Sequence, residues 1–292
     1  MGGLKEIRTR IATVKTTRQV TSAMKMVSAA KLKKSQDAIL QIRPYADKLL
    51  EILVSLSTSL QEDKASVYTG YREPKKVMIV LISSNRGLCG GFNMNIARMA
   101  VELVNLKYNM QNQLGDLHFF CIGKMGERQV KMRGMNVVKS DHEIFDNLNF
   151  GNISELASGL MKDFTDEKYD RVELVYNQFK NAAVQYNVVE RYLPVKIEKQ
   201  EGMVSNIDYI FEPSQEHIVR EVIPKSLKMQ FYKAILDSYA AEQGARMTAM
   251  HQATDNATEL LKDLMLQYNK VRQSTITNEI LEIVNGAEAL KG

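Results

Sequence analysis

The residues best placed for chemistry form a glycine-rich loop, Ser83-Ser-Asn-Arg-Gly-Leu-Cys-Gly-Gly-Phe-Asn93, between a strand-like and a helix-like segment. Loops in this position commonly hold phosphate groups. Gly87, Gly90 and Gly91 nevertheless match neither the G-x-G-x-x-G fingerprint nor a Walker loop, whose closing Gly-Lys-Ser/Thr places a lysine on the phosphates. We therefore interpret the glycines as a tight turn, with Asn93 as a candidate helix cap, and expect no nucleotide site.

The other residue types that carry chemistry form no pattern typical of a metal site or a nucleophile. Cys89 and Cys121 lack metal-ligand spacing and are too few for a disulfide framework, which suits a reducing compartment. No G-x-S-x-G motif is present. The histidines are scattered along the chain: His118, His142, His217 and His251. We expect no catalytic residue, no cofactor and no metal.

Basic residues gather at the N-terminus. Residues 1–48 contain eleven Lys or Arg and only three acidic residues, whereas the whole 292-residue chain has a net charge of +5. The densest cluster is Lys31, Lys33 and Lys34. We favour an acidic protein partner for this segment over a solvated helix face. Nucleic acid is disfavoured because no binding motif is present and no aromatic residue precedes Tyr45.

Composition and hydropathy indicate a folded chain without a membrane span. Hydrophobic residues make up 45% and charged residues 25%, which is ordinary for a soluble protein. No run approaches the roughly 18 apolar residues that a span requires. The N-terminus also lacks the apolar core of a signal peptide, so we expect neither secretion nor membrane insertion.

Two stretches without proline, 1–43 and 225–292, can form long helices, because proline breaks helix interiors. In the second stretch, residues alternate at intervals of four and three: Leu236, Ala240, Gln243, Met247, Met250, Thr254, Ala257, Leu261, Leu264, Tyr268, Val271 and Thr275. This spacing predicts a coiled-coil seam. Because the two helices flank one domain, we expect them to pair antiparallel.

The first helix shows the same period only in pieces. It opens with Leu4, Ile7, Ile11 and Val14 and closes with Ile39, Ile42, Ala46, Leu49, Leu53, Leu56 and Leu60. Between these pieces, Val20, Met24 and Val27 follow a shifted frame. Pro44 predicts a bend or an interruption, since it removes a backbone hydrogen bond. We assign residues 1–62 and 212–290 to the two coiled-coil helices.

Residues 74–205 are expected to form a small Rossmann-like α/β domain with a parallel sheet. The apolar run 77–82 is typical of a buried parallel strand. Strands and helices should alternate after it, with strands at 118–122, 172–176 and 187–193 and helices at about 93–110, 124–133 and 153–165. The last strand is predicted at an edge, because Pro194 ends it.

The C-terminal helix should extend beyond the N-terminal one, because about 75 residues span about 110 Å, against about 85 Å for the first helix. The residues expected there are apolar on more than one face: Ile276, Ile280, Leu281, Ile283, Val284, Ala287 and Leu290. A helix that is apolar all round must be enclosed. We interpret these residues as an apolar bearing inside a sleeve of other subunits, and favour this over folding back onto the α/β domain.

The sequence resembles the gamma subunits of F-type ATP synthases at both ends. The N-terminal match centres on Thr21-Ser-Ala-Met-Lys-Met-Val-Ser-Ala-Ala-Lys31. The C-terminal match includes Ala245-Arg-Met-Thr-Ala-Met250, Tyr268-Asn-Lys-Val-Arg-Gln-Ser-Thr-Ile-Thr277 and Glu282-Ile-Val-Asn-Gly-Ala287. The loop at 86–91 looks similar too, so the resemblance covers essentially the whole chain, although 134–240 matches only by pattern.

This resemblance implies a rotor that catalyses nothing itself and couples proton flow to ATP synthesis or hydrolysis. Its coiled coil would stand inside three alpha and three beta subunits, and its α/β domain would meet the epsilon subunit and the ring of c subunits. Membrane contact would be indirect, at the cytoplasmic face of a bacterial inner membrane. In the family, the positions of Met24, Lys25, Arg272, Gln273 and Thr277 meet beta subunits, and the lysines at 31–34 would face acidic beta loops.

Two functions of different classes remain open. One is the non-catalytic rotor, and the other is a small-molecule-binding α/β enzyme with helical arms for oligomerisation. The glycine-rich loop would favour the enzyme only if it bound phosphate. The long seam, the overhang and the uneven charge favour the rotor. The family's chloroplast members carry an inserted cysteine pair that is missing here, so we expect no thiol switch.

Overall fold

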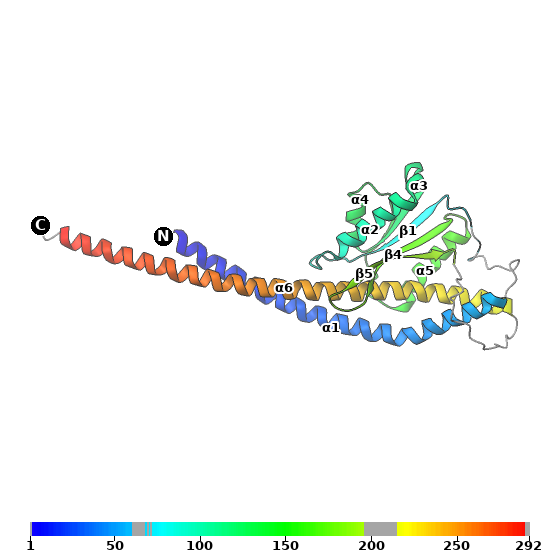
Figure 1. Cartoon of the computed structure of the whole chain (residues 1–292), viewed down its shortest axis with the longest axis horizontal. Coiled ribbons are helices and arrows are strands. Elements are labelled where there is room, and N and C mark those ends of the chain that lie inside the picture. Colours follow the sequence, from blue (N-terminus) through cyan, green and yellow to red (C-terminus); the bar gives the residue numbers. More distant parts are fainter. Residues whose placement is uncertain (1, 60–67, 69, 71, 196–214, 290–292) are drawn as a thin grey trace. The chain divides into compact units, whose positions relative to one another are not determined.

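The computed structural model describes residues 2–59, 68, 70, 72–195 and 215–289 (Figure 1). Its elements are α1 (Gly2–Ser59), β1 (Val77–Ile82), α2 (Phe92–Lys107), α3 (Asn109–Leu114), β2 (Leu117–Ile122), α4 (Lys124–Lys131), β3 (Val137–Asp141), α5 (Phe150–Thr165), β4 (Arg171–Phe179), β5 (Gln185–Leu193) and α6 (Gln215–Ala289). The chain divides into a smaller unit, residues 1–28 with 247–292, and a larger unit, residues 29–246. Among the described residues, no helix combines the length and apolarity needed to cross a membrane.

The larger unit is built on a five-stranded sheet with the order β3-β2-β1-β4-β5. β1 pairs in parallel with β2 and β4, and β2 pairs in parallel with β3, whereas β5 is antiparallel to β4. The predicted α/β domain is therefore confirmed, with a mixed and mostly parallel sheet. β5 ends directly before Pro194 and lies at an edge, as predicted.

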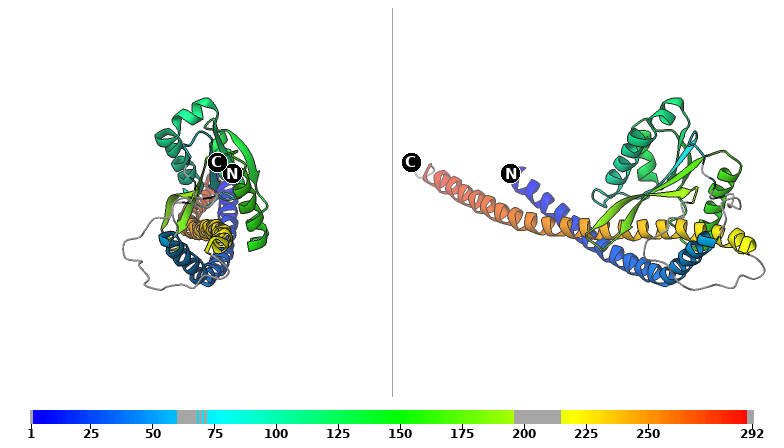
Figure 2. Two further views of the ribbon diagram at one scale, coloured as in Figure 1. Left: turned by 90° about the vertical axis from the view of Figure 1, so that its right-hand side faces the viewer. Right: turned by 45° about the vertical axis from the view of Figure 1, so that its right-hand side comes forward.

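Helices cover both faces of this sheet, which explains the unbroken apolar run of β1. Alternate residues of Val77–Ile82 enter two separate cores. One core contains Ile96 of α2, and the other contains Phe164 of α5 and Phe231 of α6. Figure 2 shows α2 and α4 on one side of the sheet and α5 on the other. A strand covered on both faces needs apolar residues at every position.

Strand β3 has no counterpart in the sequence prediction. Its residues, Val-Val-Lys-Ser-Asp, are all partly or fully exposed at the edge of the sheet. Backbone pairing with β2 holds it, with a register shift between Phe119 and Phe120. A short, polar edge strand lacks the apolar run by which the buried strands were recognised.

Both long helices contribute to the larger unit. α1 passes through Pro44 without interruption, and its second half is curved (Figure 1). Of the two outcomes predicted for Pro44, a bend or an interruption, the structure therefore shows the bend. α6 begins before Pro224 and packs against the sheet. Its buried residues in that core are Ile223, Leu227, Phe231, Ala234 and Ile235. α6 is therefore a core helix of the α/β unit as well as a coiled-coil helix.

In the smaller unit the two helices run antiparallel, as predicted (Figures 1 and 2). The seam on α6 is confirmed, because these residues are 4% to 6% exposed: Met250, Ala257, Leu261 and Leu264. The shifted frame in α1 is wrong. Thr21 and Ser28 are buried, whereas Val20 and Val27 are 52% and 56% exposed. The heptad thus continues through small polar residues, which a search for apolar side chains overlooked.

Polar contacts join the two helices at two levels. Thr21 Oγ1 lies 2.8 Å from Thr254 Oγ1, and Arg8 Nη2 donates to the Tyr268 hydroxyl at 2.9 Å. From Tyr268 α6 continues to Ala289, about 30 Å of further helix. The predicted overhang is therefore present, and the C-terminal end of α6 extends well beyond the start of α1 in Figure 1.

Candidate partner-binding surfaces

The overhang of α6 exposes a group of large apolar side chains. Each of the following is between 47% and 71% exposed: Ile276, Ile280, Leu281, Ile283 and Val284. Ala287 is exposed as well, and Leu290 lies outside the described residues. Contiguous exposed apolar groups mark surfaces that bind another chain. We call these six exposed residues the apolar stripe.

The apolar stripe does not surround the helix. At about 100° per residue, its side chains fall within an arc of about 160°. The opposite arc carries Asn278, Glu279, Glu282 and Asn285. The apolar surface is therefore narrower than the sequence analysis expected, since that analysis counted apolar residues without placing them around the helix. The overhang therefore has a mainly apolar front, which also carries Thr277 and Glu288, and a polar back.

Arg272, Gln273 and Thr277 are exposed on the same overhang, close to Tyr268 in sequence. The Thr277 hydroxyl donates to the carbonyl oxygen of Gln273 at 3.0 Å. The pKa of Tyr268 is lowered, chiefly by the hydrogen bond from Arg8 and also by the charge of Arg272. The guanidinium groups of Arg8 and Arg272 therefore both favour the ionised form of Tyr268, and they make the base of the overhang positively charged.

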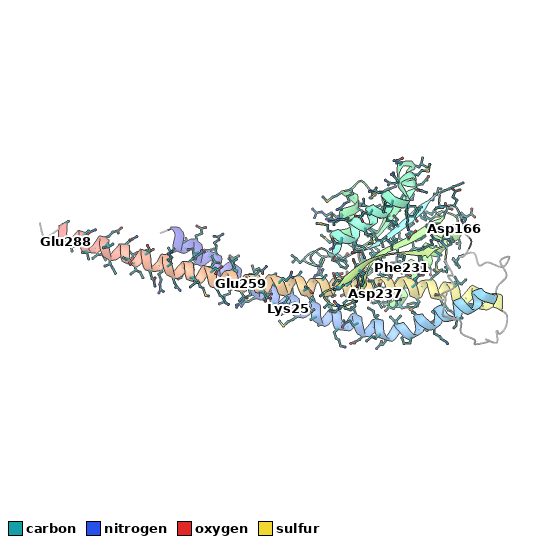
Figure 3. All side chains as sticks on the ribbon, in the orientation of Figure 1. Lys25, Asp166, Phe231, Asp237, Glu259 and Glu288 are labelled. Carbon is teal, nitrogen blue, oxygen red and sulfur yellow. The ribbon has the colours of Figure 1, made fainter. Side chains whose placement is uncertain are left out.

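Met24 and Lys25 are half-buried in the paired part of the smaller unit, where Figure 3 labels Lys25. They are not brought near Arg272. Thr21, one turn before Lys25, meets Thr254, and Thr254 precedes Arg272 by about 27 Å of helix. The predicted beta-binding residues therefore form two separate regions of the smaller unit.

The sequence analysis missed a group of exposed apolar side chains on α1. Val20, Met26 and Val27 are 52%, 62% and 56% exposed on α1. Val20 and Val27 had been assigned to the seam, so their exposure was not foreseen. Following the heptad through Thr21 and Ser28 would have revealed it. Val20 and Val27 lie within about 60° of Met24 around the helix and on nearly the opposite side from Lys25, so they enlarge the contact region on the Met24 side.

Lys31, Lys33 and Lys34 are all exposed on the part of α1 that belongs to the larger unit. Lys33 Nζ lies 2.8 Å from Asp37 Oδ1. Burial raises the pKa of Glu242, and the charges of Arg246 and Lys31 oppose this rise. Two of the three lysines therefore already act on carboxylates of their own chain.

The glycine-rich loop is held by its own side chains. Asn93 Oδ1 accepts from the backbone N–H of Ser84 at 3.0 Å, and Ser84 Oγ donates to the carbonyl oxygen of Arg86 at 2.7 Å. The sequence analysis proposed Asn93 as the cap of α2, and this prediction is wrong. The cap position is Gly91, which makes no side-chain hydrogen bond. Leu88 adopts a positive φ of 62°, so the chain turns sharply here.

A charged cluster that no motif indicated links α4 to the end of β3. His142 Nε2 lies 2.6 Å from Glu127 Oε2, and Lys131 pairs with the other oxygen of Glu127. The pKa of Glu127 is lowered, first by the hydrogen bond from Lys131 and further by the bond from His142. Within the described ranges, no group of three or more His, Cys, Asp or Glu side chains could hold a metal. Glu127 of α4 thus pairs with Lys131 of its own helix and is joined by a hydrogen bond to His142 at the end of β3.

Comparison with known sequences gives a consistent result. The sequence matches the family described as ATP synthase over residues 3–290. The ATP synthase gamma chain of Flavobacterium psychrophilum is 54% identical over 292 residues, which is 100% of both chains. The ATP synthase gamma chain of Chlorobaculum parvum is 43% identical, again over 100% of both chains.

Solved structures agree with the sequence comparisons. A chain of the Tetrahymena thermophila mitochondrial ATP synthase, solved with the central stalk and c-ring, has a TM-score of 0.58 and 26% identity. The match covers 80% of this chain and 99% of that one. A chain of the Euglena gracilis mitochondrial ATP synthase has a TM-score of 0.69, covering 99% and 95%. At 18% identity, this second likeness concerns the fold.

Proposed function

The chain belongs to the ATP synthase gamma chain family, and from this premise we propose which surfaces it uses as the rotor of the central stalk. As that rotor subunit of an F-type ATP synthase, it performs no catalysis itself. Its smaller unit stands inside a ring of three alpha and three beta subunits. Residues 74–205 form the foot, which meets the epsilon subunit and the c-ring.

The observation that carries this assignment of surfaces is the apolar stripe. A helix that leaves five large apolar side chains about half exposed or more is incomplete without a partner. The two-helix pair does not cover them, because Arg8 already lies level with Tyr268, α1 begins only six residues before Arg8, and the stripe stays exposed in the presence of α1. A sleeve of alpha and beta subunits around the overhang supplies the missing cover. Because the stripe lacks charges, it serves as a bearing without fixed ion pairs.

Residues outside the apolar stripe make the polar contacts with the beta subunits. Arg272, Gln273 and Thr277 meet the beta subunits as a catch, since a guanidinium makes directional hydrogen bonds that form in one orientation only. Met24 and Lys25, with the exposed Val20 and Val27 on the Met24 side of the helix, form a second beta contact lower on the coiled coil. Of the lysine cluster, Lys34 is best placed for an acidic beta loop, because Lys31 and Lys33 also act within the chain.

The foot and the location follow from the relatives. The Tetrahymena structure joins a chain of this fold to a central stalk and c-ring, and the most similar relatives reported above are bacterial. We assign the chain to the cytoplasmic face of a bacterial inner membrane, with membrane contact only through the c-ring. No cofactor, metal or nucleic acid enters this function.

The experiment is reconstitution of a bacterial F-type synthase in sealed vesicles, with and without this chain. With the chain, ATP hydrolysis should drive proton uptake, which a pH-sensitive dye reports. Without it, hydrolysis by the remaining subunits should not be coupled to uptake. Full proton pumping in its absence, or no pumping in its presence in a complete complex, would contradict the assignment.

A further inference from the structure

Arg246 holds helix α6 to the glycine-rich loop and forms a buried ion pair with Glu242 of the same helix. Arg246 Nη1 donates to Glu242 Oε1 at 2.6 Å, and the two side chains are 9% and 8% exposed. Arg246 Nη2 donates to the carbonyl oxygens of Arg86 and Gly87 at 3.0 and 3.3 Å. Charge-assisted hydrogen bonds of this kind are strong and directional. They fix the angle of the helix, whereas apolar packing is non-directional.

The loop that receives these bonds is anchored to the sheet. The backbone N–H of Ser83 donates to the carbonyl oxygen of Ile122 at 2.8 Å, and Ser83 Oγ accepts from the N–H of Gly126 at 2.9 Å. Ser84 holds the carbonyl of Arg86 in place at 2.7 Å. The carbonyl groups that bind Arg246 are thus linked through the loop to β1, β2 and α4.

The opposite side of α6 rests against the turn between β4 and β5. A Cβ atom added at Gly244 would lie 3.2 Å from the carbonyl oxygen of Ala182, so the turn packs tightly against this glycine and would have to shift slightly to admit a side chain. Asn181 Oδ1 accepts from the N–H of Val184 at 2.8 Å and braces the turn. Gly244 lies about 200° around the helix from Glu242. The α/β unit therefore grips α6 from two sides.

We propose that this clamp, formed by Arg246, Glu242 and Gly244 of α6, is the joint through which the α/β domain transmits torque to the helix. The proposal rests on the rotor function. Arg246 is the last residue of α6 within the larger unit, so it marks where torque passes onward along the helix. Turning α6 by about 30° would move side-chain ends, at a radius of about 5–6 Å, by about 3 Å. Such a movement breaks both carbonyl contacts and drives the helix into the turn.

The test measures protons pumped per ATP hydrolysed by the complete synthase in sealed vesicles. Arg246→Met removes the carbonyl contacts and keeps a long side chain. We expect a normally assembled complex that pumps about twofold fewer protons per ATP, because the directional bonds are lost. Arg246→Lys keeps the charge on a single ammonium group and should restore part of the coupling.

A second variant separates torque from folding. Removing Arg246 alone leaves Glu242 buried without its partner, so Glu242→Gln/Arg246→Met removes both charges. We expect the same loss of coupling. Lys225→Met is the matched control, since Lys225 forms an exposed pair with Glu221 at 2.8 Å on the same helix. It should pump normally.

The outcomes keep the two proposals apart. Normal coupling in the double variant would overturn the joint and leave the rotor function standing. Failure of both Arg246→Met and Glu242→Gln/Arg246→Met to assemble, while Lys225→Met assembles, would also overturn it, because the pair would then serve folding only. A wild-type complex that hydrolyses ATP without pumping would instead contradict the rotor function.

Discussion

His118 shows how a single partly buried side chain makes the stability of the larger unit depend on pH. Its Nδ1 atom is buried with no hydrogen-bond partner among the described residues, and its ring meets Tyr169 edge-on with centroids 5.7 Å apart. Burial lowers the pKa of His118, the charges of Lys76 and Lys168 lower it further, and Asp116 opposes them. The folded chain therefore resists protonation at this site.

This lowered pKa predicts acid sensitivity of a definite sign. The contribution of neutral His118 to the free energy of unfolding is fully present above the ordinary histidine pKa of about 6.5. It is lost as the pH falls from there towards the lowered pKa that His118 has in the folded chain. Wild type should lose more unfolding free energy between about pH 7.5 and about pH 5.5 than His118→Gln. Denaturant unfolding of the isolated chain at both pH values measures this. Equal losses would contradict the buried, neutral state of His118.

Arg272 is expected to affect turnover more than assembly. It is exposed, so its removal leaves no buried charge, and a charge-assisted hydrogen bond contributes roughly 1.5–3 kcal/mol, which is about tenfold to a hundredfold in rate. Arg272→Leu should therefore slow ATP hydrolysis by the complex about tenfold or more at normal subunit stoichiometry. Lys270→Leu, an exposed neighbour, is the control and should change little. An unassembled Arg272→Leu complex would show that this residue serves assembly.

At the scale of elements, the overhang of α6 separates an apolar front from a polar back, and the two should respond differently. Ile283→Asp, like Leu281→Lys, would bury an unpaired charge in the sleeve at a cost of several kcal/mol and prevent assembly. Ile283→Leu should be nearly silent. Glu282→Gln, on the polar back of the same turn, is the matched control. Subunit stoichiometry and ATP hydrolysis decide, and a normally assembled, fully active Ile283→Asp complex would rule out the bearing.

How far the sequence predicts each element depends on how much apolar surface the element buries. The run 77–82 and the heptads of α6 bury apolar side chains at regular spacing. The sequence therefore predicted both the buried parallel strand and the coiled-coil seam. β3 buries little and escaped notice. The seam of α1 passes through Thr21 and Ser28, whose small polar side chains fit the seam without marking it.

Sites made by tertiary contact left no local pattern at all. Arg246 forms a hydrogen bond with Arg86, which lies 160 residues earlier in the sequence. His142 contacts Glu127 at a spacing that fits no motif. The family resemblance could name Met24 or Arg272, but it could not show that Val20 and Val27 face solvent. Such features depend on where the fold places a side chain, which residue spacing alone does not determine.

At the scale of the whole molecule, the two units differ in whether their polar and apolar groups are satisfied within the chain. In the larger unit, polar groups at the carboxyl end of β1 are used internally, by Ser84, Asn93 and Arg246. In the smaller unit, large apolar side chains and guanidinium groups are left exposed. A subunit that transmits force needs the first property in its foot and the second on the surface that meets its partners.

This division predicts that the isolated chain neither hydrolyses ATP nor binds it with a micromolar Kd. A magnesium-bound triphosphate needs a lysine, a hydroxyl and inward-facing N–H groups, and the loop at 83–93 lacks the Gly-Lys-Ser/Thr ending. Its carbonyl oxygens at Arg86 and Gly87 are turned towards Arg246, where they would repel phosphate oxygens rather than bind them. Titration calorimetry of the full chain with Mg-ATP should therefore show no saturation at micromolar nucleotide. A micromolar Kd would revive the alternative of a small-molecule-binding α/β enzyme, because the loop would then have opened to expose its N–H groups. Activity in the assembled complex must come from sites on other subunits, so hydrolysis there with no binding by this chain alone is the combined result that the rotor requires.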